Sequence, residues 1–132
     1  MKIVFDSNVY LAATKPKSYA REQLERSGFN GPYKIYISPE IITEVREVLE
    51  PRFFYESNNS ANFIDMILLY ATLVQSRRRV TNVLNNTDDH IILECAIEAK
   101  AQTIVTAYRG LLRLKEFEDI AIIHPTMLQY LK

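Results

Sequence analysis

Short apolar runs separated by polar segments predict a series of buried strands. The first run, residues 2–5, ends at Asp6, and residues 33–37 alternate in a strand-like way. Two further runs cover residues 103–105 and 120–123, and a short extended segment is expected at residues 80–84. Apolar runs of this kind, bounded by turn residues, are typical of strands that are buried in a sheet.

Between these runs, apolar residues recur at helical spacing and follow residues that commonly cap helices. Ser7 or Asn8 is expected to cap the first helix. Ser38 followed by Pro39 opens a helix that Pro51 is expected to end. The predicted helices cover residues 9–12, 18–27, 39–50, 61–76, 88–100 (capped by 85–87), 109–116 and 125–131.

Strands that alternate with helices, without tight hairpin turns, predict a parallel sheet with helices on both faces. With no linker, repeat or low-complexity stretch, residues 1–132 are expected to form one α/β domain. Ligands of such sheets bind at the carboxyl ends of the strands, which makes Asp6 a candidate ligand-binding residue.

Composition and charge bear on three kinds of function: nucleic-acid binding, disulfide or zinc sites, and membrane contact. The 16 basic and 16 acidic side chains give a formal net charge of zero, so any RNA binding must come from local patches. The single cysteine cannot form an internal disulfide, and no Cys/His cluster has zinc-site spacing. The chain shows neither a secretory leader nor an apolar run of about 18 residues, so we expect a cytoplasmic protein without membrane contact.

Three acidic positions are candidates for one site. An aspartate after a strand, such as Asp6, can be a turn former, a helix cap or a hard oxygen ligand. Among the glutamates of the predicted helix 39–50, Glu44 lies nearest the apolar stripe of Ile41 and Val45, where an unpaired carboxylate is costly.

The third position is the pair Asp88 and Asp89 at the start of the predicted helix 88–100. Capping and the helix dipole account for aspartates in a first turn, but both of these also face the apolar side of the helix. The adjacent His90 is expected to be an ordinary exposed helix residue.

Five segments resemble the motifs of PIN domains, in the same order along nearly the whole chain. Phe5-Asp6-Ser7-Asn8-Val9-Tyr10-Leu11 resembles the opening motif, and Ser38-Pro39-Glu40-Ile41-Ile42-Thr43-Glu44-Val45 the second, which ends in an acid. Asp88-Asp89-His90-Ile91-Ile92-Leu93-Glu94-Cys95-Ala96 is similar to the third motif, with Asp89 in the place of the acid. Ala101-Gln102-Thr103-Ile104-Val105-Thr106 and Ile122-Ile123-His124-Pro125 resemble the last two strands.

The resemblance implies a three-layer α/β/α sandwich with a central parallel sheet of four to five strands. It also implies a metal-dependent endoribonuclease, most often the VapC-like toxin of a toxin–antitoxin pair. An RNA substrate, a small antitoxin partner and a homodimer follow from the same resemblance.

The chemistry of the acidic positions favours a hard divalent cation. Clustered carboxylates tolerate one another when Mg²⁺ or Mn²⁺ lies between them, and an all-oxygen set argues against zinc. We expect Asp6 and Asp89 as ligands, Glu44 as ligand or water-orienting base, and Asp88 as substitute or helper. Asn8 and Thr106 are expected to support the ligands by hydrogen bonds.

One position departs from the PIN pattern. After the strand that ends in Thr106, PIN nucleases usually present Gly-Asp, but here Ala107 and Tyr108 follow. A phenol is a poor ligand for Mg²⁺, and its ring is expected to intrude on the site. The departure keeps a second hypothesis open, a catalytically degenerate PIN domain that binds RNA or protein.

A third hypothesis is a receiver-like or phosphohydrolase domain that uses Asp6 and Asp88–Asp89. Against it, the late lysine candidate Lys115 lies on a predicted helix rather than at a strand end.

Several basic residues are candidate RNA contacts. Lys15 and Lys17 follow the first motif, and Arg109 follows Tyr108, so all three are expected near the mouth of the site. The run 77–79 is expected to be a solvated face rather than an RNA contact.

Overall fold

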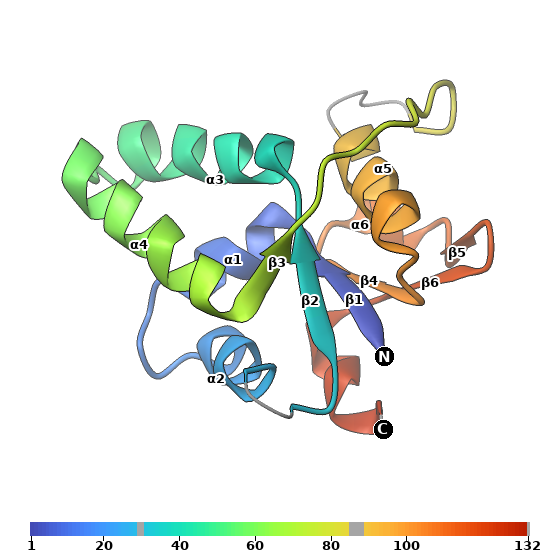
Figure 1. The fold of residues 1–132 in the computed structure, drawn as a ribbon, viewed down its shortest axis with the longest axis horizontal. Coiled ribbons are helices and arrows are strands. Elements are labelled where there is room, and N and C mark those ends of the chain that lie inside the picture. The colour runs from blue at the N-terminus through green and yellow to red at the C-terminus, as the bar shows by residue number, and fades with distance from the viewer. Residues whose placement is uncertain (29–30, 85–88, 132) are drawn as a thin grey trace.

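The computed structural model describes residues 1–28, 31–84 and 89–131. Within them one six-stranded sheet runs in the order β3-β2-β1-β4-β6-β5 (Figure 1). The strands are β1 Lys2–Phe5, β2 Lys34–Ile37, β3 Ala71–Leu73, β4 Thr103–Val105, β5 Glu116–Phe117 and β6 Ile120–Ile123. Five strands are parallel, as predicted, and β5 adds an antiparallel edge.

Helices cover both faces of this sheet. They are α1 Ser7–Ala12, α2 Tyr19–Arg26, α3 Pro39–Arg52, α4 Ser57–Tyr70, α5 His90–Ala99 and α6 Arg109–Leu112, with a 3-10 helix, η2, at Pro125–Tyr130. Figure 1 shows α5 on one side of the sheet, against β1, β2 and β4, and α1, α2 and α4 on the other. The predicted three-layer α/β/α architecture is confirmed. No helix in the described ranges is long and apolar enough to cross a membrane.

The pairing of the two central strands, β1 and β4, fixes which residues meet at their carboxyl ends. Val4, Ile104 and Val105 are fully buried, because both faces of β1 and β4 are covered. Phe5 pairs with Val105, so the next residues of the two strands, Asp6 and Thr106, lie side by side.

Helix α3 starts at the same edge. Ser38 caps it as predicted, since its hydroxyl accepts from the backbone N–H of Ile41. Because α3 contacts both α1 and α5, it carries its acidic side chains past the carboxyl ends of the strands. The prediction that Pro51 ends this helix is wrong, since α3 continues to Arg52.

The region after α3 differs from the predicted helix 61–76. Helix α4 begins at Ser57 and ends at Tyr70, and the next three residues form β3, which pairs with β2. The apolar run through residues 67–74 suits either a helix or a buried strand, and the long-range ladder with β2 decides between them.

The expectation that no tight hairpin occurs is also wrong. Strands β5 and β6 are joined by Glu118 and Asp119, both at positive φ (47° and 69°). Two such residues are the pattern of a type I′ hairpin turn, and neither is the glycine that usually signals one. The predicted helix 109–116 is therefore shorter in the structure: α6 ends at Leu112, and Glu116 belongs to β5.

The segment before α5 is held by side chains of α5. Glu94 is buried and accepts from the backbone N–H of Val80 at 2.9 Å. His90 is 4% exposed, contrary to the expected exposed residue, and its Nε2 accepts from the N–H of Leu84 at 3.1 Å. No strand forms at residues 80–84, and the predicted cap at residues 85–87 lies outside the described residues.

Candidate metal centre

Asp6 is the buried centre of the carboxyl edge. It follows β1, caps α1 and is 4% exposed. The residue expected to cap α1 was Ser7 or Asn8; instead the Asp6 Oδ1 accepts from the Ser7 backbone N–H at 2.7 Å. A backbone hydrogen bond from the Asp6 N–H to the Val105 carbonyl continues the ladder of β1 and β4 and fixes its position.

Two further side chains donate to this carboxylate. Thr106 Oγ1 donates to Asp6 Oδ2 at 2.7 Å, and Asn8 Nδ2 donates to the same oxygen at 3.0 Å. Asn8 Oδ1 in turn accepts from the Ala107 N–H at 3.1 Å. The structure therefore brings Asn8 and Thr106 to Asp6, each held by its neighbours.

Burial and hydrogen bonding act on Asp6 in opposite directions. Burial raises its pKa above the ordinary value of 3.8, and the donors from Thr106, Ser7 and Asn8 only partly offset this. The folded protein therefore binds a proton at Asp6 more readily than the unfolded chain does. Without a cation, Asp6 therefore contributes to the free energy of unfolding at low pH. This contribution is lost as pH rises from about 3.8 through the pKa that Asp6 has in the folded protein.

Ser7 connects Asp6 to Glu44 on α3. The Ser7 hydroxyl donates to Glu44 Oε1 and lies 3.4 Å from Asp6 Oδ1. A hydroxyl has one hydrogen, and the 3.4 Å contact to Asp6 is too long to compete with Glu44 for it. Asp6 Oδ1 thus keeps acceptor capacity on the side that faces Ser7 and Glu44.

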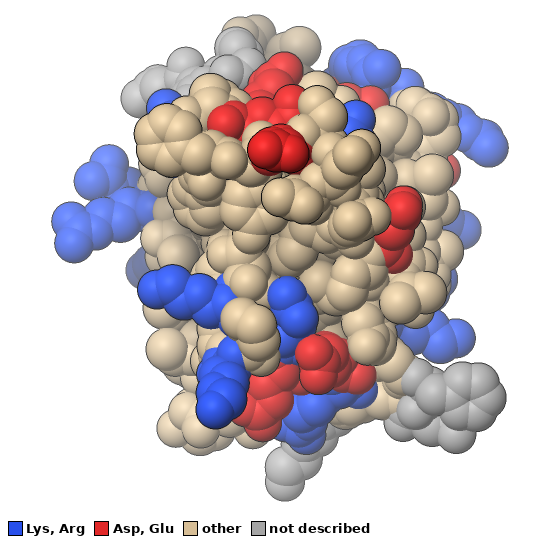
Figure 2. All heavy atoms as spheres, turned by 90° about the vertical axis from the view of Figure 1, so that its left-hand side faces the viewer, with Lys and Arg blue, Asp and Glu red and all other residues tan. Residues whose placement is uncertain are grey.

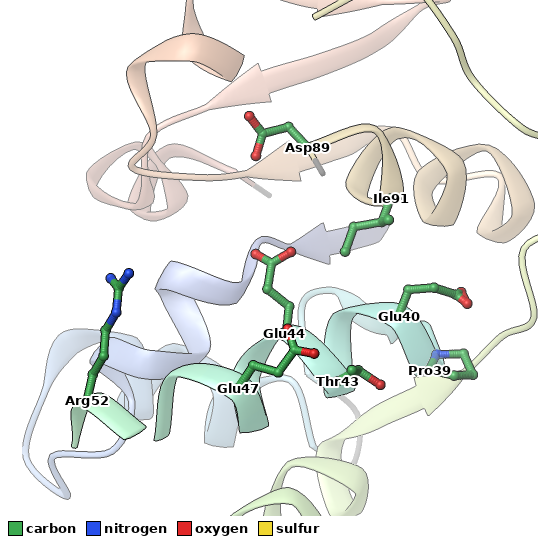
Figure 3. A pocket seen from close by; sticks show the side chains of 8 residues that line it. All are labelled: Pro39, Glu40, Thr43, Glu44, Glu47, Arg52, Asp89 and Ile91. Carbon is green, nitrogen blue, oxygen red and sulfur yellow. The ribbon is translucent and has the colours of Figure 1, made fainter. Parts of the chain in front are cut away.

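Glu44 and Asp89 line one cleft of about 620 Å³ between α3 and the start of α5. Figure 3 shows Glu44 extending from α3 into this cleft toward the wall that carries Asp89, while Glu40, beside Pro39 at the start of α3, points away from Glu44. Arg52, two helical turns after Glu44, also reaches into the cleft.

Acidic side chains outnumber basic ones in the lining of this cleft. Helix α3 carries Glu40, Glu44, Glu47 and Glu50. Figure 2 shows one group of acidic side chains at the upper part of this face and a second group lower down, which lies among basic side chains. Such a cleft attracts cations.

The donor set suits a hard cation, but its members are not gathered around one point. Asp6, Glu44 and Asp89 offer carboxylate oxygens, the ligands that Mg²⁺ and Mn²⁺ prefer. Across the described ranges, however, no three acidic, histidine or cysteine side chains are placed to hold one ion. Asp88 lies outside the described residues. The structure thus links Asp6 to Glu44 and places Glu44 and Asp89 on one cleft.

Comparisons with known proteins identify the family. A model of the PIN domain matches residues 2–109. The chain belongs to the PIN domain family. The search of curated proteins found no match.

The fold of this PIN domain also occurs in a solved toxin–antitoxin structure. It is similar to a chain of VapBC2 from Rickettsia felis, a complex bound to a DNA fragment from the promoter of its own genes. The TM-score is 0.69, with 94% of this chain and 98% of that chain covered, at 16% identity. At this identity the likeness shows a shared fold.

Tyr108, the position at which the PIN resemblance leads us to expect an acid, does not line the 620 Å³ cleft. Tyr108 is 43% exposed and lines a neighbouring cleft of about 240 Å³ that shares Asp89 with the first. Its backbone N–H donates to Thr106 Oγ1 at 3.0 Å. The ring therefore borders the acidic site from one side.

The basic residues of this PIN domain are spread around the site. Lys15 lines a separate groove together with Asn8, and Lys17 and Arg109 are exposed. In the run 77–79, Arg78 binds both carboxylate oxygens of Glu118, at 2.7 and 2.6 Å. One arginine of the run thus binds the turn of the β5–β6 hairpin.

Sequence reasoning missed Ser7 and Arg52. Ser7 was considered only as a cap, and nothing in one sequence indicates that its hydroxyl turns toward α3. For Arg52 a signal existed, because its spacing of eight residues from Glu44 puts both on one face of a continuous helix. The expected break at Pro51 hid that signal.

The Thr106 hydroxyl is expected to control the ionisation of Asp6. Thr106→Val keeps the size of the side chain but removes a donor to Asp6 Oδ2, so the pKa of Asp6 should rise further. The measurement is an NMR titration of the Asp6 carboxyl carbon in EDTA. Thr103→Val, at the start of β4, is the matched control and should leave the midpoint in place; an unchanged or lowered midpoint in Thr106→Val would contradict the assignment.

Proposed function

We propose that this PIN domain is a Mg²⁺- or Mn²⁺-dependent endoribonuclease and the toxin of a toxin–antitoxin pair. One observation carries the proposal: Ser7 links buried Asp6 to Glu44, since its N–H donates to Asp6 and its hydroxyl to Glu44, and Glu44 lines one cleft with Asp89. A buried carboxylate with a raised pKa, next to further carboxylates, is stabilised in its ionised form by a cation.

Each acid has a distinct role in this proposal. Asp6 and Asp89 would hold the ion, and Glu44 would ligate it or orient the attacking water; Asp88 is a possible further ligand. When bound, the ion supplies a water of lowered pKa and offsets the charge of the scissile phosphate. Ser7 orients Glu44, while Asn8 and Thr106 hold the Asp6 carboxylate in one rotamer.

The wider assignment rests on the family and on the shared fold. PIN domains of the VapC type are generally nucleases that cut RNA, and the fold of this chain is that of a VapBC2 chain. We therefore propose RNA as substrate, a small antitoxin as partner and a homodimer as the assembly. Lys15, Lys17 and Arg109 are the proposed contacts to RNA phosphates.

A second candidate is a degenerate PIN domain that binds RNA or protein without cutting. Tyr108 in the place of the fourth acid favours it, because it leaves the site with less negative charge to hold a second ion. Metal binding and cleavage separate the two candidates.

Asp6→Ala is expected to abolish Mn²⁺ binding in calorimetric titration. RNA cleavage by the variant should fall by about 100-fold or more, as when one group that acts at the transition state is lost. Asp65→Ala, which removes an exposed aspartate of α4, is the matched control and should behave as wild type. Wild-type protein that neither binds Mn²⁺ nor cuts RNA with Mn²⁺ would reject the nuclease and leave the binding module.

Restoring the fourth acid is expected to strengthen metal binding. Tyr108→Asp adds a carboxylate beside Thr106, so affinity for Mn²⁺ should increase by about tenfold or more. Tyr108→Asn also removes the ring but adds no charge, and it should leave the affinity near that of wild type. Equal affinities in the two variants would show that position 108 does not contribute to the ion site.

A further inference from the structure

The cleft beside Tyr108 has the composition of a binding site for a flat ring. Its volume is about 240 Å³. Leu84 and Leu114 supply apolar wall, Tyr108 an aromatic ring, and Arg113 and Asp89 polar groups. A nucleobase has the same division, with apolar faces and polar edges, so each part of the cleft has a counterpart on the base.

Gly110 gives the Tyr108 ring its place. A Cβ at position 110 would lie 2.4 Å from Tyr108 Cε2, 2.8 Å from Cζ and 2.9 Å from Oη. Any side chain there would displace the ring, although the backbone at Gly110 does not itself require glycine. The ring therefore lies directly against the start of α6 and is supported on that side.

The ring is also tied to the acidic site through its own backbone. The Tyr108 N–H donates to Thr106 Oγ1, and the same hydroxyl donates to Asp6. Asp89 lines both this cleft and the 620 Å³ cleft beside Glu44. A group bound against Tyr108 is thus adjacent to the proposed site of phosphodiester cleavage.

From these observations we infer that Tyr108 is a stacking platform for an unpaired base of the RNA, next to the phosphate that is cut. The identity of the ligand as RNA rests on the proposed function; the platform itself rests on the ring, Gly110 and the cleft. Bases inside an A-form helix are stacked on their neighbours and not open to a side chain, so the substrate is single-stranded at this position. Arg113 supplies donors for the base edge or the adjoining phosphate.

The test uses an oligouridylate that carries one 2-aminopurine, whose fluorescence is quenched when the base stacks. Titration in EDTA with the full chain measures binding without cleavage. Tyr108→Ala should weaken binding by roughly 5- to 100-fold, the effect of losing one aromatic–base stack, and Tyr108→Phe should stay within about twofold of wild type. Gly110→Ala should also weaken binding, since its methyl group displaces the ring.

Tyr19→Ala is the matched control, because Tyr19 is similarly exposed (41%) and lines neither cleft. It should bind as wild type, and a complementary duplex should compete poorly. The inference is overturned if wild type does not quench the probe, if Tyr108→Ala binds as tightly as wild type, if Tyr19→Ala loses as much, or if the duplex competes equally.

Failure of this inference can be told apart from failure of the proposed function. Tyr108-dependent quenching without Mn²⁺-dependent cleavage of any RNA supports the platform and rejects the nuclease. Cleavage by a protein whose binding is indifferent to Tyr108→Ala rejects the platform and keeps the nuclease.

Discussion

The hydrogen bond between the Thr106 hydroxyl and the Asp6 carboxylate, at the ends of two adjacent parallel strands, is the interaction on which the rest of the site depends. A carboxylate buried at this edge is costly unless donors surround it. Hydrogen bonds to charged groups contribute about 1.5–3 kcal/mol each. Because Phe5 pairs with Val105, the sheet itself delivers Thr106 to Asp6.

The same contact organises the elements around it. The Asp6 side chain starts α1, the Asn8 amide bonds both Asp6 and the backbone after Thr106, and the Thr106 hydroxyl receives the N–H of Tyr108. The edge of the sheet thereby sets the position of the helix that follows each central strand. Two clefts meet beside this network, one acidic and one partly aromatic, and Asp89 belongs to both.

Local patterns predicted the parts of the fold that depend on local chemistry. The strand before Asp6 and the Ser38 cap of α3 are present, since an apolar run and a capping residue followed by proline each act within a few residues. The boundary of α4 and β3 was not predictable in this way, because pairing with β2 decides it. The β5–β6 turn was missed because Glu118 and Asp119 carry no glycine signal.

The candidate site was only partly predictable for a related reason. Asp6, Asn8 and Thr106 meet because strand register brings them together, and the parallel pattern anticipated that edge. The Ser7 bridge depends on how α1 packs against α3, and the Nε2 bond of buried His90 depends on the course of a loop. Neither arrangement has a signature in the spacing of residues along the chain.

We propose that Asp6 and Asp89 hold one divalent cation, with Glu44 as a further ligand or as the group that orients water. Anomalous diffraction from a crystal soaked in Mn²⁺ would locate the ion directly. We expect a peak beside the 620 Å³ cleft that Glu44 and Asp89 line, about 2.0–2.4 Å from oxygens of Asp6 and Asp89, with Glu44 turned toward it. A peak elsewhere on the molecule, or none at saturating Mn²⁺, would contradict it.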